Sequence, residues 1–250
     1  MSRDLSWVVA RPIAHRGLHD RAKGVIENTA SAFRAAIARG FAYECDVQLT
    51  ADGEAVVFHD FDLDRLTTST GRVIDHSAAA LAQMTMKDTA DRIGTVADMF
   101  ALTAGKALIV CEIKSANDGD MRLTERVATL ARHYSGPLVI KSFDPRVVRH
   151  WHSLGTGIPA GIVAMNDYEY PDYAMLSAQE KHALANLLHF ADTRPDFVSW
   201  RVRDLPCAAP YLCRAALGLP LMTWTVRTPE DREAASRNAD QMVFENFIPD

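Results

Sequence analysis

The sequence alternates short apolar runs with amphipathic stretches along almost its whole length, and this alternation sharply narrows the folds that the chain can adopt. Short apolar runs bounded by turn residues predict buried strands, whereas stretches with apolar residues three or four positions apart predict helices. A strand followed by a helix, many times over, is typical of a parallel sheet with right-handed connections. About eight such units in one chain favour a closed (β/α)8 TIM barrel over an open sheet.

Several apolar runs have the length and composition of strands. They are Pro12–His15, Ala42–Gln48, Ala55–His59, Leu108–Lys114, Leu138–Ser142, Ala160–Val163, Phe197–Trp200, Leu221–Thr225 and Gln241–Glu245. Helices are expected between most of them, at residues 27–40, 120–134, 145–154, 178–190, 207–217 and 229–236. No low-complexity linker interrupts the series, so we expect a single domain over residues 1–250.

The segment from about residue 60 to residue 106 departs from this pattern. It contains polar turn residues (LTTSTGRV) and two short helix candidates, near Ser77–Met84 and at Val96–Thr103. That is more than one connection between strands needs, so we expect a small insertion after the second barrel strand. A second long connection, from Ala164 to about Ala178, is rich in Asp, Tyr and Pro and is a candidate to cover the mouth of the barrel.

The composition is that of an ordinary globular protein, with 48% hydrophobic and 24% charged residues. A net charge of −5 and a pI near 6.0, without a dominant basic run, argue against a nucleic-acid partner. The apolar stretch before Arg11 is too short for a signal peptide, and no window is long enough for a membrane span. We therefore expect a cytoplasmic protein, and the sequence predicts no particular oligomeric state.

Acidic side chains lie inside two of the predicted strands. Glu44 and Asp46 are two residues apart in YECDVQL and so share one face of their strand, and Glu112 follows in VCEIK. A TIM barrel carries its active site at the C-terminal ends of the strands, which brings these mutually repelling carboxylates together. A divalent cation with oxygen ligands, Mg²⁺ or Ca²⁺ rather than Zn²⁺, would offset the repulsion. The alternative is a structural salt-bridge network in which Arg16 and Lys114 neutralise the acids.

Two histidines also fall at strand ends, beside these cations. His15 lies in IAHRG and His59 in VVFHD, where imidazoles can serve as general acid and general base. The guanidinium of Arg16 and the ammonium of Lys114 suit a phosphate group. No GxGxxG, P-loop or GxSxG motif is present, so the combination indicates phosphoryl chemistry, with water or a neighbouring hydroxyl as the nucleophile, rather than nucleotide-cofactor or serine-hydrolase chemistry.

In order along the chain, the segments IAHRG, IENTASAF, YECDVQLTADGEAVVFHD, LDRLTT and CEIK resemble the motifs of the glycerophosphodiester phosphodiesterase family. The resemblance covers roughly residues 12 to 114, and KSFD and MTWTV continue it more loosely. It implies a TIM barrel with a small insertion, and a hydrolase of lipid and glycerol metabolism that uses one divalent cation, Mg²⁺ or Ca²⁺. The implied substrates are small glycerophosphodiesters such as glycerophosphocholine or glycerophosphoethanolamine, cleaved to an alcohol and sn-glycerol 3-phosphate.

The same resemblance implies a role for each candidate residue. It implies acid–base catalysis by His15 and His59, metal ligation by Glu44, Asp46 and Glu112, and phosphate contacts from Arg16 and Lys114. Trp224 falls where the family has an aromatic wall beside the glycerol. Phe143 is a candidate for the same groove, although its spacing alone is equally consistent with a packing role.

Two stretches depart from the family pattern. Ile26 stands where the family has the proline of PENT, while Glu27 and Asn28 are kept. Near the C-terminus the chain reads NADQMVFENF where the family has a VDGIITD-like strand, so Glu245 and Asn246 are the candidates to supply polar groups there.

Other functions fit the same scaffold. One is a lysophospholipase D or a sugar-phosphodiester hydrolase, and a broad apolar groove near Ala164–Tyr173 would favour the lipid substrate. Another is a non-catalytic protein that only binds phosphodiesters. Binding alone does not require both His15 and His59, so the pair favours an enzyme.

Overall fold

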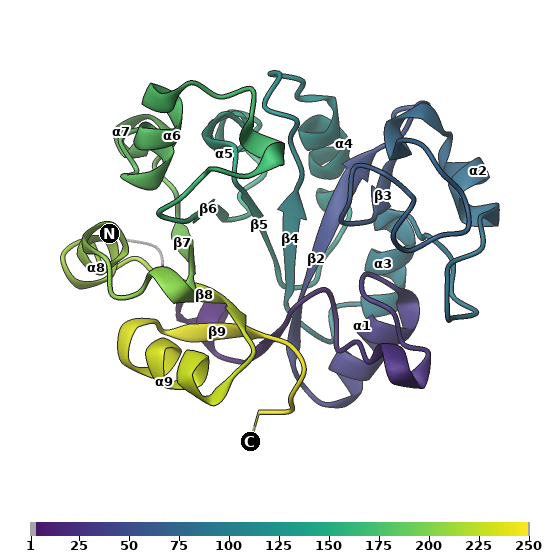
Figure 1. Cartoon of the computed structure of the whole chain (residues 1–250), viewed down its shortest axis with the longest axis horizontal. Coiled ribbons are helices and arrows are strands. Elements are labelled where there is room, and N and C mark those ends of the chain that lie inside the picture. The colour runs from purple at the N-terminus through teal and green to yellow at the C-terminus, as the bar shows by residue number, and fades with distance from the viewer. Residues whose placement is uncertain (1–3, 250) are drawn as a thin grey trace. The chain divides into compact units, whose positions relative to one another are not determined.

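The computed structural model of the chain describes residues 4–249 (Figure 1). Its strands are β1 (Ile13–Ala14), β2 (Ala42–Leu49), β3 (Ala55–Val57), β4 (Ile109–Ile113), β5 (Leu138–Ser142), β6 (Ala160–Ala164), β7 (Phe197–Arg201), β8 (Leu221–Val226) and β9 (Gln241–Phe244). Every predicted strand is therefore present in the described chain, with only its ends shifted.

The strands follow the order β1-β9-β8-β7-β6-β5-β4-β2-β3, and β1 also pairs with β2. Apart from β3, the strands thus close into an eight-stranded barrel. The pairing of β2 with β4 is parallel, as are the successive pairings from β5 to β9. Helices separate consecutive barrel strands, so the chain has the predicted (β/α)8 TIM-barrel fold.

Strand β3 is not part of the parallel series, because it folds back on β2 as an antiparallel hairpin. The two strands are joined only by residues 50–54, whereas a parallel connection needs about a dozen residues. A hydrogen bond from Thr50 N to Glu54 O (3.0 Å) closes the turn. The hairpin register sets Val57 opposite Val47, so the chain beyond β3 returns along β2 before it enters the insertion.

The helices occupy the positions expected from the sequence, although several are shorter. They are α1 (Ala30–Ala38), α2 (Ala78–Gln83), α3 (Val96–Thr103), α4 (Arg122–Ala131), α5 (Pro145–Ser153), α6 (Ala178–Ala185), α7 (Phe190–Thr193), α8 (Ala208–Ala215) and α9 (Pro229–Asn238). Helix α1 begins at Ala30 rather than near Glu27 because Asn28 is left-handed (φ 58°) and Thr29 caps the helix. The stretch predicted as one helix over 178–190 is divided into α6 and α7, with Leu187 left-handed (φ 51°) between them.

The chain divides into two compact units, of which one comprises Ala14–Lys114 and Met121–Leu138. In this unit α1 and α4 pack against β2, which Figure 1 shows as a long strand beside β3 and β4. Phe33 on α1 stacks on Tyr43 of β2 with ring centroids 4.5 Å apart. The expectation that the whole chain is a single domain stays a prediction.

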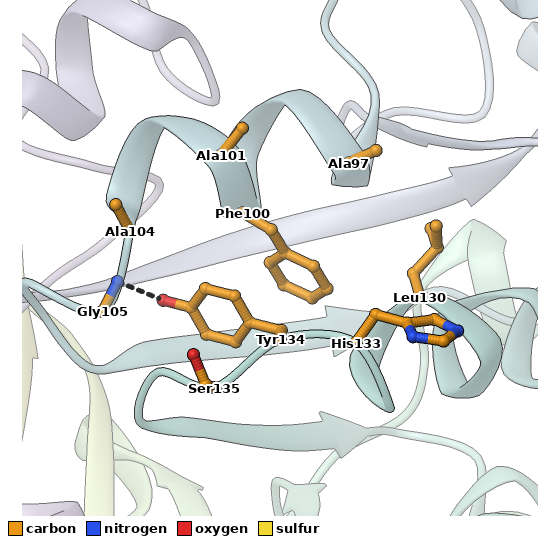
Figure 2. A pocket seen from close by; sticks show the side chains of 9 residues that line it. All are labelled: Ala97, Phe100, Ala101, Ala104, Gly105, Leu130, His133, Tyr134 and Ser135. Atoms are coloured by element: carbon orange, nitrogen blue, oxygen red, sulfur yellow. Dashed lines mark hydrogen bonds between the residues drawn. The ribbon is translucent and has the colours of Figure 1, made fainter.

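A pocket of ≈ 460 Å³ lies in the same unit, beside α3 and α4 (Figure 2). Tyr134 stacks on Phe100 there with ring centroids 4.4 Å apart, and its hydroxyl accepts a hydrogen bond from Gly105 N (3.2 Å). The pocket lining contains none of the predicted site residues, and we interpret the pocket as a consequence of how these helices pack.

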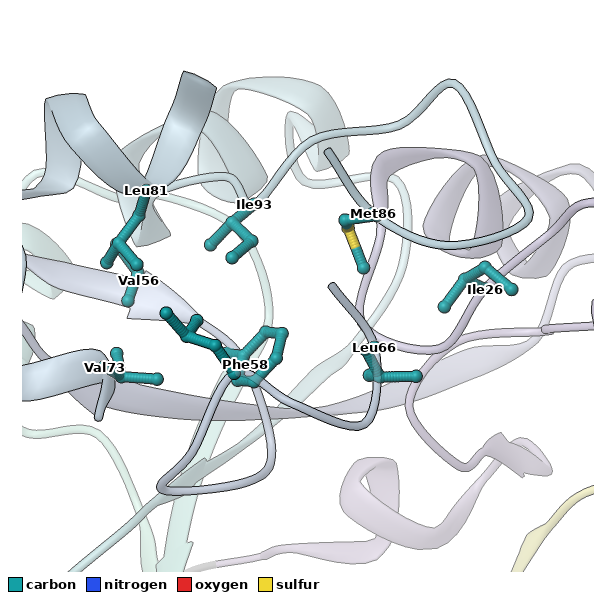
Figure 3. Close-up of a cluster of buried hydrophobic side chains, with 9 residues drawn as sticks. Ile26, Val56, Phe58, Leu66, Val73, Leu81, Met86 and Ile93 are labelled. Atoms are coloured by element: carbon teal, nitrogen blue, oxygen red, sulfur yellow. The ribbon is translucent and has the colours of Figure 1, made fainter. Parts of the chain in front are cut away.

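The insertion is held to β3 by a cluster of buried apolar side chains (Figure 3). Its buried members are Ile26, Val56, Phe58, Leu63, Leu66, Val73, Leu81, Met86 and Ile93. We call these residues the insertion core. Ile26 is only 2% exposed within it, which explains the departure from the family's proline, because a branched apolar side chain fills this position.

The other unit contains the rest of the described chain, including β6 to β9 and their helices. A smaller apolar cluster there groups buried Met165, Tyr168 and Leu184 with partly buried neighbours that include Phe143 and Trp224. Between residues 4 and 249, no helix has both the length and the apolar character that crossing a membrane requires. The cytoplasmic location stays a prediction.

Candidate active site

Three carboxylates meet at neighbouring positions of β2 and β4. The parallel register pairs Asp46 with Glu112, and Glu44 lies two residues before Asp46 on the same face of β2. One oxygen from each side chain lies within 4.8 Å of the others, and the residues are buried, with at most 4% of any of them exposed. The predicted acidic cluster of Glu44, Asp46 and Glu112 is therefore present, and the strand register creates it.

Both predicted cations contact this acidic cluster. Lys114 Nζ lies 2.8 Å from Asp46 Oδ1 and 2.6 Å from Glu112 Oε1. Arg16 donates its backbone N–H to Glu44 Oε2 (2.9 Å), and its guanidinium Nε lies 3.5 Å from Asp46 Oδ2. Each acid of the cluster thus has at least one cationic residue beside it.

These contacts set the charge states of the buried groups. Burial raises the pKa of Asp46, but the charges of Lys114 and His59 outweigh burial and hold that pKa well below its usual range. Burial lowers the pKa of Lys114, yet the carboxylates of Asp46 and Glu112 raise that pKa above its usual value. Asp46 and Lys114 are therefore both charged at neutral pH.

A tight turn after β1 places His15 and Arg16 beside the cluster. Arg16 and Gly17 are both left-handed (φ 55° and 80°), and Gly17 N donates to Glu44 O (3.1 Å). A Cβ atom on Gly17 would lie 2.7 Å from Ala32 Cβ, so only glycine fits this position. The turn leaves His15 only 7% exposed. The glycine of IAHRG is therefore required by the backbone that carries the histidine and the arginine.

His59 reaches the cluster because of the antiparallel hairpin. Phe58 N, just after β3, donates to Asp46 O (3.0 Å), and Gln48 Nε2 donates to His59 O (2.9 Å). The imidazole Nδ1 of His59 lies 2.7 Å from Asp60 Oδ1, while the His59 side chain remains 28% exposed. A carboxylate on Nδ1 favours the tautomer with its proton there, which leaves Nε2 for acid–base chemistry.

Asn28 joins the site although its sequence position gave it no predicted role. Its Nδ2 donates to Asp46 Oδ2 (2.9 Å), and its Oδ1 accepts from Asp46 N (3.1 Å). Its own backbone N donates to Arg16 O (2.8 Å). Asn28 therefore holds the turn after β1 against β2. Asn28 has a left-handed backbone, a conformation that asparagine tolerates better than most residues. The asparagine of IENT is therefore a sequence signal for this turn.

Ion pairs and hydrogen bonds surround the acidic cluster. They join the carboxylates of Glu44, Asp46, Glu112, Glu27 and Asp60 to Arg16, Lys114 and Arg65. Buried carboxylate oxygens at the spacing of Glu44, Asp46 and Glu112 also suit a hard ion such as Mg²⁺ or Ca²⁺. The donor set of these three acids therefore fits a bound divalent cation.

Phe143 and Trp224 lie in the other unit and contact each other. Their rings meet edge to face with centroids 5.4 Å apart, and Tyr173 approaches Phe143 at 6.0 Å. Trp224 Nε1 donates to Ser199 O (3.1 Å), which fixes the indole. Both side chains are partly buried in the apolar cluster of this unit, and their contact with a substrate stays a prediction.

The residue that follows the unusual C-terminal strand is already paired. Glu245 Oε1 lies 2.6 Å from Arg227 Nε, and Asn246 after it is left-handed (φ 68°). The carboxylate of Glu245 therefore belongs to an ion pair within its own unit.

Glu27 makes the stability of the folded chain depend on pH. Burial raises its pKa, but hydrogen bonds from Arg65 and the charge of Arg16 lower it from 4.5 to about 2. A depressed folded pKa means that the stabilisation is complete above the unfolded pKa and is lost as the pH falls through the folded one. We expect this group to account for a loss of about 3 kcal/mol in the free energy of unfolding between about pH 5 and about pH 2.

Urea unfolding at a series of pH values measures this loss. Glu27→Gln should be less stable than the wild type at pH 7 and should show a flatter dependence below about pH 5. Equal slopes for the two proteins in that range would contradict the assignment of the depressed pKa to Glu27.

The model of the glycerophosphoryl diester phosphodiesterase family matches residues 15–245 of the chain. A glycerophosphodiester phosphodiesterase from Caldanaerobacter subterraneus is 28% identical over 231 residues, which cover 88% of this chain and 87% of that protein. An Oleispira antarctica phosphodiesterase, solved in complex with the product sn-glycerol-3-phosphate, is 18% identical with a TM-score of 0.76, over 96% of this chain and 94% of that one. A Thermotoga maritima glycerophosphodiester phosphodiesterase is 23% identical with a TM-score of 0.70, over 93% and 92% of the two chains.

The family match runs from the histidine of the turn after β1 to the residue after β9, and so includes every predicted catalytic, metal-binding and substrate-binding residue. The two solved structures share the barrel fold with this chain, as their TM-scores show. The sequence match and the fold therefore agree: the chain belongs to the glycerophosphoryl diester phosphodiesterase family.

Proposed function

We propose that the protein hydrolyses small glycerophosphodiesters, such as glycerophosphocholine or glycerophosphoethanolamine, to an alcohol and sn-glycerol 3-phosphate. Family membership makes the chain a phosphodiesterase. The observation that supports the finer proposal is the buried acidic cluster, with Arg16 and Lys114 against it and His59 next to Asp60 at its edge. This arrangement suits a phosphodiester, whose negative charge must be offset before a nucleophile can approach.

One divalent cation, Mg²⁺ or Ca²⁺, would be held by Glu44, Asp46 and Glu112. Such an ion, when bound, supplies positive charge to the phosphate oxygens in the transition state. Arg16 would add positive charge beside this ion, because its guanidinium Nε lies 3.5 Å from Asp46 Oδ2. Lys114 is already bound to two carboxylates, so its contribution to the phosphate is its charge.

His15 and His59 are proposed to act as the acid–base pair. The leaving alcohol must gain a proton at neutral pH and the attacking nucleophile must lose one, so two proton-transfer groups are needed. His59 fits this task because Asp60 occupies its Nδ1 while part of the ring stays exposed. His15 fits because the turn after β1 fixes it directly before Arg16.

More observations support the glycerol 3-phosphate half of the proposed substrate than support its head group. The Oleispira antarctica relative is described with sn-glycerol-3-phosphate as its product, which supports the same product for this chain. Phe143 and Trp224 are proposed to contact the glycerol carbons, since their edge-to-face pair offers a rigid apolar surface.

A lipid substrate is the second candidate, because the segment after β6 exposes large apolar side chains. Tyr170 is 45% exposed and Met175 is 59% exposed. A lysophospholipase D would use such side chains to contact an acyl chain.

A substrate comparison separates the two candidates. Purified protein with Mg²⁺ or Ca²⁺ is given glycerophosphocholine or lysophosphatidylcholine, and phosphate-ester products are quantified. We expect kcat/KM for glycerophosphocholine to exceed that for the lipid by at least about 10-fold, since the proposed mode of binding recognises the phosphate and the glycerol and makes no use of an acyl chain. A preference for the lipid would replace the proposed substrate class, and no product from either substrate with either ion would overturn the activity.

A further inference from the structure

Arg65, from the LDRLTT segment, joins two carboxylates that lie far apart in the sequence. Its Nε and Nη2 donate to Asp60 (2.5 and 2.9 Å), and its Nη1 and Nη2 donate to Glu27 (2.9 and 2.7 Å). A planar guanidinium with several fixed donors can make such a bridge, whereas a lysine ammonium cannot reproduce it. Arg65 is thus the single link between Asp60 and Glu27 among the contacts of the described chain.

Each of these carboxylates in turn contacts a residue of the proposed site. Asp60 Oδ1 lies 2.7 Å from His59 Nδ1, and Glu27 Oε1 lies 2.6 Å from Arg16 Nη1. Arg65 is therefore linked to the proposed acid–base residue His59 through one intervening side chain, that of Asp60. It is linked to the proposed phosphate-binding residue Arg16 through another, that of Glu27.

The backbone around this bridge is anchored by the insertion core (Figure 3). Ile26 precedes Glu27, Phe58 precedes His59 and Leu66 follows Arg65, and all three apolar side chains are at most 3% exposed. The carboxylates and the guanidinium consequently start from fixed positions, and the hydrogen bonds need only orient the side-chain ends.

The side chains that can still rotate are those in the exposed parts of the site. The His59 side chain is 28% exposed and the Arg65 side chain 43%, while that of Glu27 is only 14% exposed. An imidazole with this exposure rotates about its side-chain bonds unless its Nδ1 is held. Asp60 can hold it only if Asp60 itself has a fixed orientation, and Arg65 binds both oxygens of that carboxylate.

We propose that Arg65 is a positioning residue for the reaction: it orients His59 through Asp60 and Arg16 through Glu27, so that the acid–base group and the phosphate-binding group keep one fixed spacing. This inference rests on the proposed function for the roles of His59 and Arg16. Arg65 itself touches neither substrate nor metal in this account. Because Arg65 belongs to the insertion, the insertion contributes to catalysis through this residue.

Kinetics of Arg65→Ala and Arg65→Lys test the proposal on the full chain. We expect kcat for glycerophosphocholine to fall by about 10–100-fold in Arg65→Ala, because a misplacement of about 1 Å in a catalytic group costs up to about 100-fold. KM should rise by less than kcat falls, and Arg65→Lys should recover only part of kcat, since one ammonium cannot bridge both carboxylates.

Arg126 provides the matched control. It also forms a bidentate pair with a carboxylate, from Nε and Nη2 to Glu54 at 2.8 and 2.7 Å, and its side chain is similarly exposed at 34%. Arg126→Ala should cost comparable stability but leave kcat unchanged. An equal loss of kcat in both variants would mean that Arg65 acts through stability alone.

A double-mutant cycle with Asp60→Asn identifies the route of the effect. If Arg65 works through Asp60, most of the loss in Arg65→Ala should already be present in Asp60→Asn, and the double variant should be little worse than either single one. If the losses multiply in the double variant, the route through Asp60 to His59 is overturned. An unchanged kcat in Arg65→Ala would overturn the positioning role as a whole, and neither outcome would affect the proposed phosphodiesterase activity.

A spectroscopic readout keeps the inference independent of turnover. The imidazole ¹⁵N and ring-proton NMR signals of His59 should shift in Arg65→Ala and stay in place in Arg126→Ala. Unchanged His59 signals in Arg65→Ala would contradict the proposal even if the wild type released no product from any phosphodiester. A wild type without activity would, separately, overturn the proposed function.

Discussion

Replacing either His15 or His59 with alanine should lower kcat for glycerophosphocholine by about 10²–10⁴-fold, because each substitution removes one proton transfer from the transition state. KM should change little, since neither imidazole is proposed to supply most of the binding energy. The loss should be as large for His59 as for His15, although the two residues reach the site by different routes, one after an antiparallel hairpin and one after β1.

The control for these variants is His182→Ala, which alters an exposed histidine on α6. It should keep the kcat of the wild type. Thermal unfolding and metal binding of His15→Ala and His59→Ala should stay close to the wild type, so that a lower kcat reports chemistry. Turnover within a few-fold of the wild type in either variant would remove that histidine from the acid–base pair.

Replacing Glu112 with glutamine should weaken the binding of Mg²⁺ or Ca²⁺ by about 10²-fold or more, because changing even an outer partner of a metal ligand typically costs 10–100-fold. Glu112 is directly opposite Asp46 and supplies one of the buried oxygens within 4.8 Å of the others. The variant should retain its fold, since Lys114 keeps its contact with Asp46. Its kcat/KM should fall with the metal occupancy and recover partly at high metal concentration.

Metal-dependent thermal unfolding provides a readout that does not need turnover. An ion at about 100 times its Kd adds about 2.7 kcal/mol to the stability of a protein that binds it only when folded. The wild type should therefore unfold at a higher temperature with the ion, and Glu112→Gln should lose that shift. Glu230→Gln, which alters an exposed acid on α9, should keep it. A full metal shift in Glu112→Gln would exclude Glu112 as a ligand, and Glu44→Gln provides a second variant of the cluster.

The fold could be predicted because its determinants are local. Each apolar run of the barrel is short, each helix has its own apolar periodicity, and the order of the two is fixed by the chain. The acidic cluster was predictable for the same reason: Glu44 and Asp46 share a face by alternation, and the parallel neighbour of their strand carries Glu112. The resemblance to the family then assigned roles that spacing alone leaves open.

The parts that were not predicted depend on contacts between distant segments. The segment AVVFH reads as one more strand, but the short turn before it makes β3 antiparallel and returns His59 to Asp46. Asn28 and Arg65 contact acids that lie 18 and 38 residues away along the chain, and no local pattern specifies those pairs. Ile26 departs from the proline of the family motif, and its packing in the insertion core depends on residues far away along the chain.

Cleavage of a glycerophosphodiester should require a divalent cation in the acidic cluster. This requirement is measured by the release of sn-glycerol 3-phosphate from glycerophosphocholine by the wild type, first after removal of metal with EDTA and then after addition of Mg²⁺ or Ca²⁺. We expect release to stop in EDTA and to return with at least one of the two ions in the wild type, but not in Glu112→Gln at the same ion concentration. Release that continues at the same rate in EDTA would contradict a role for the cation.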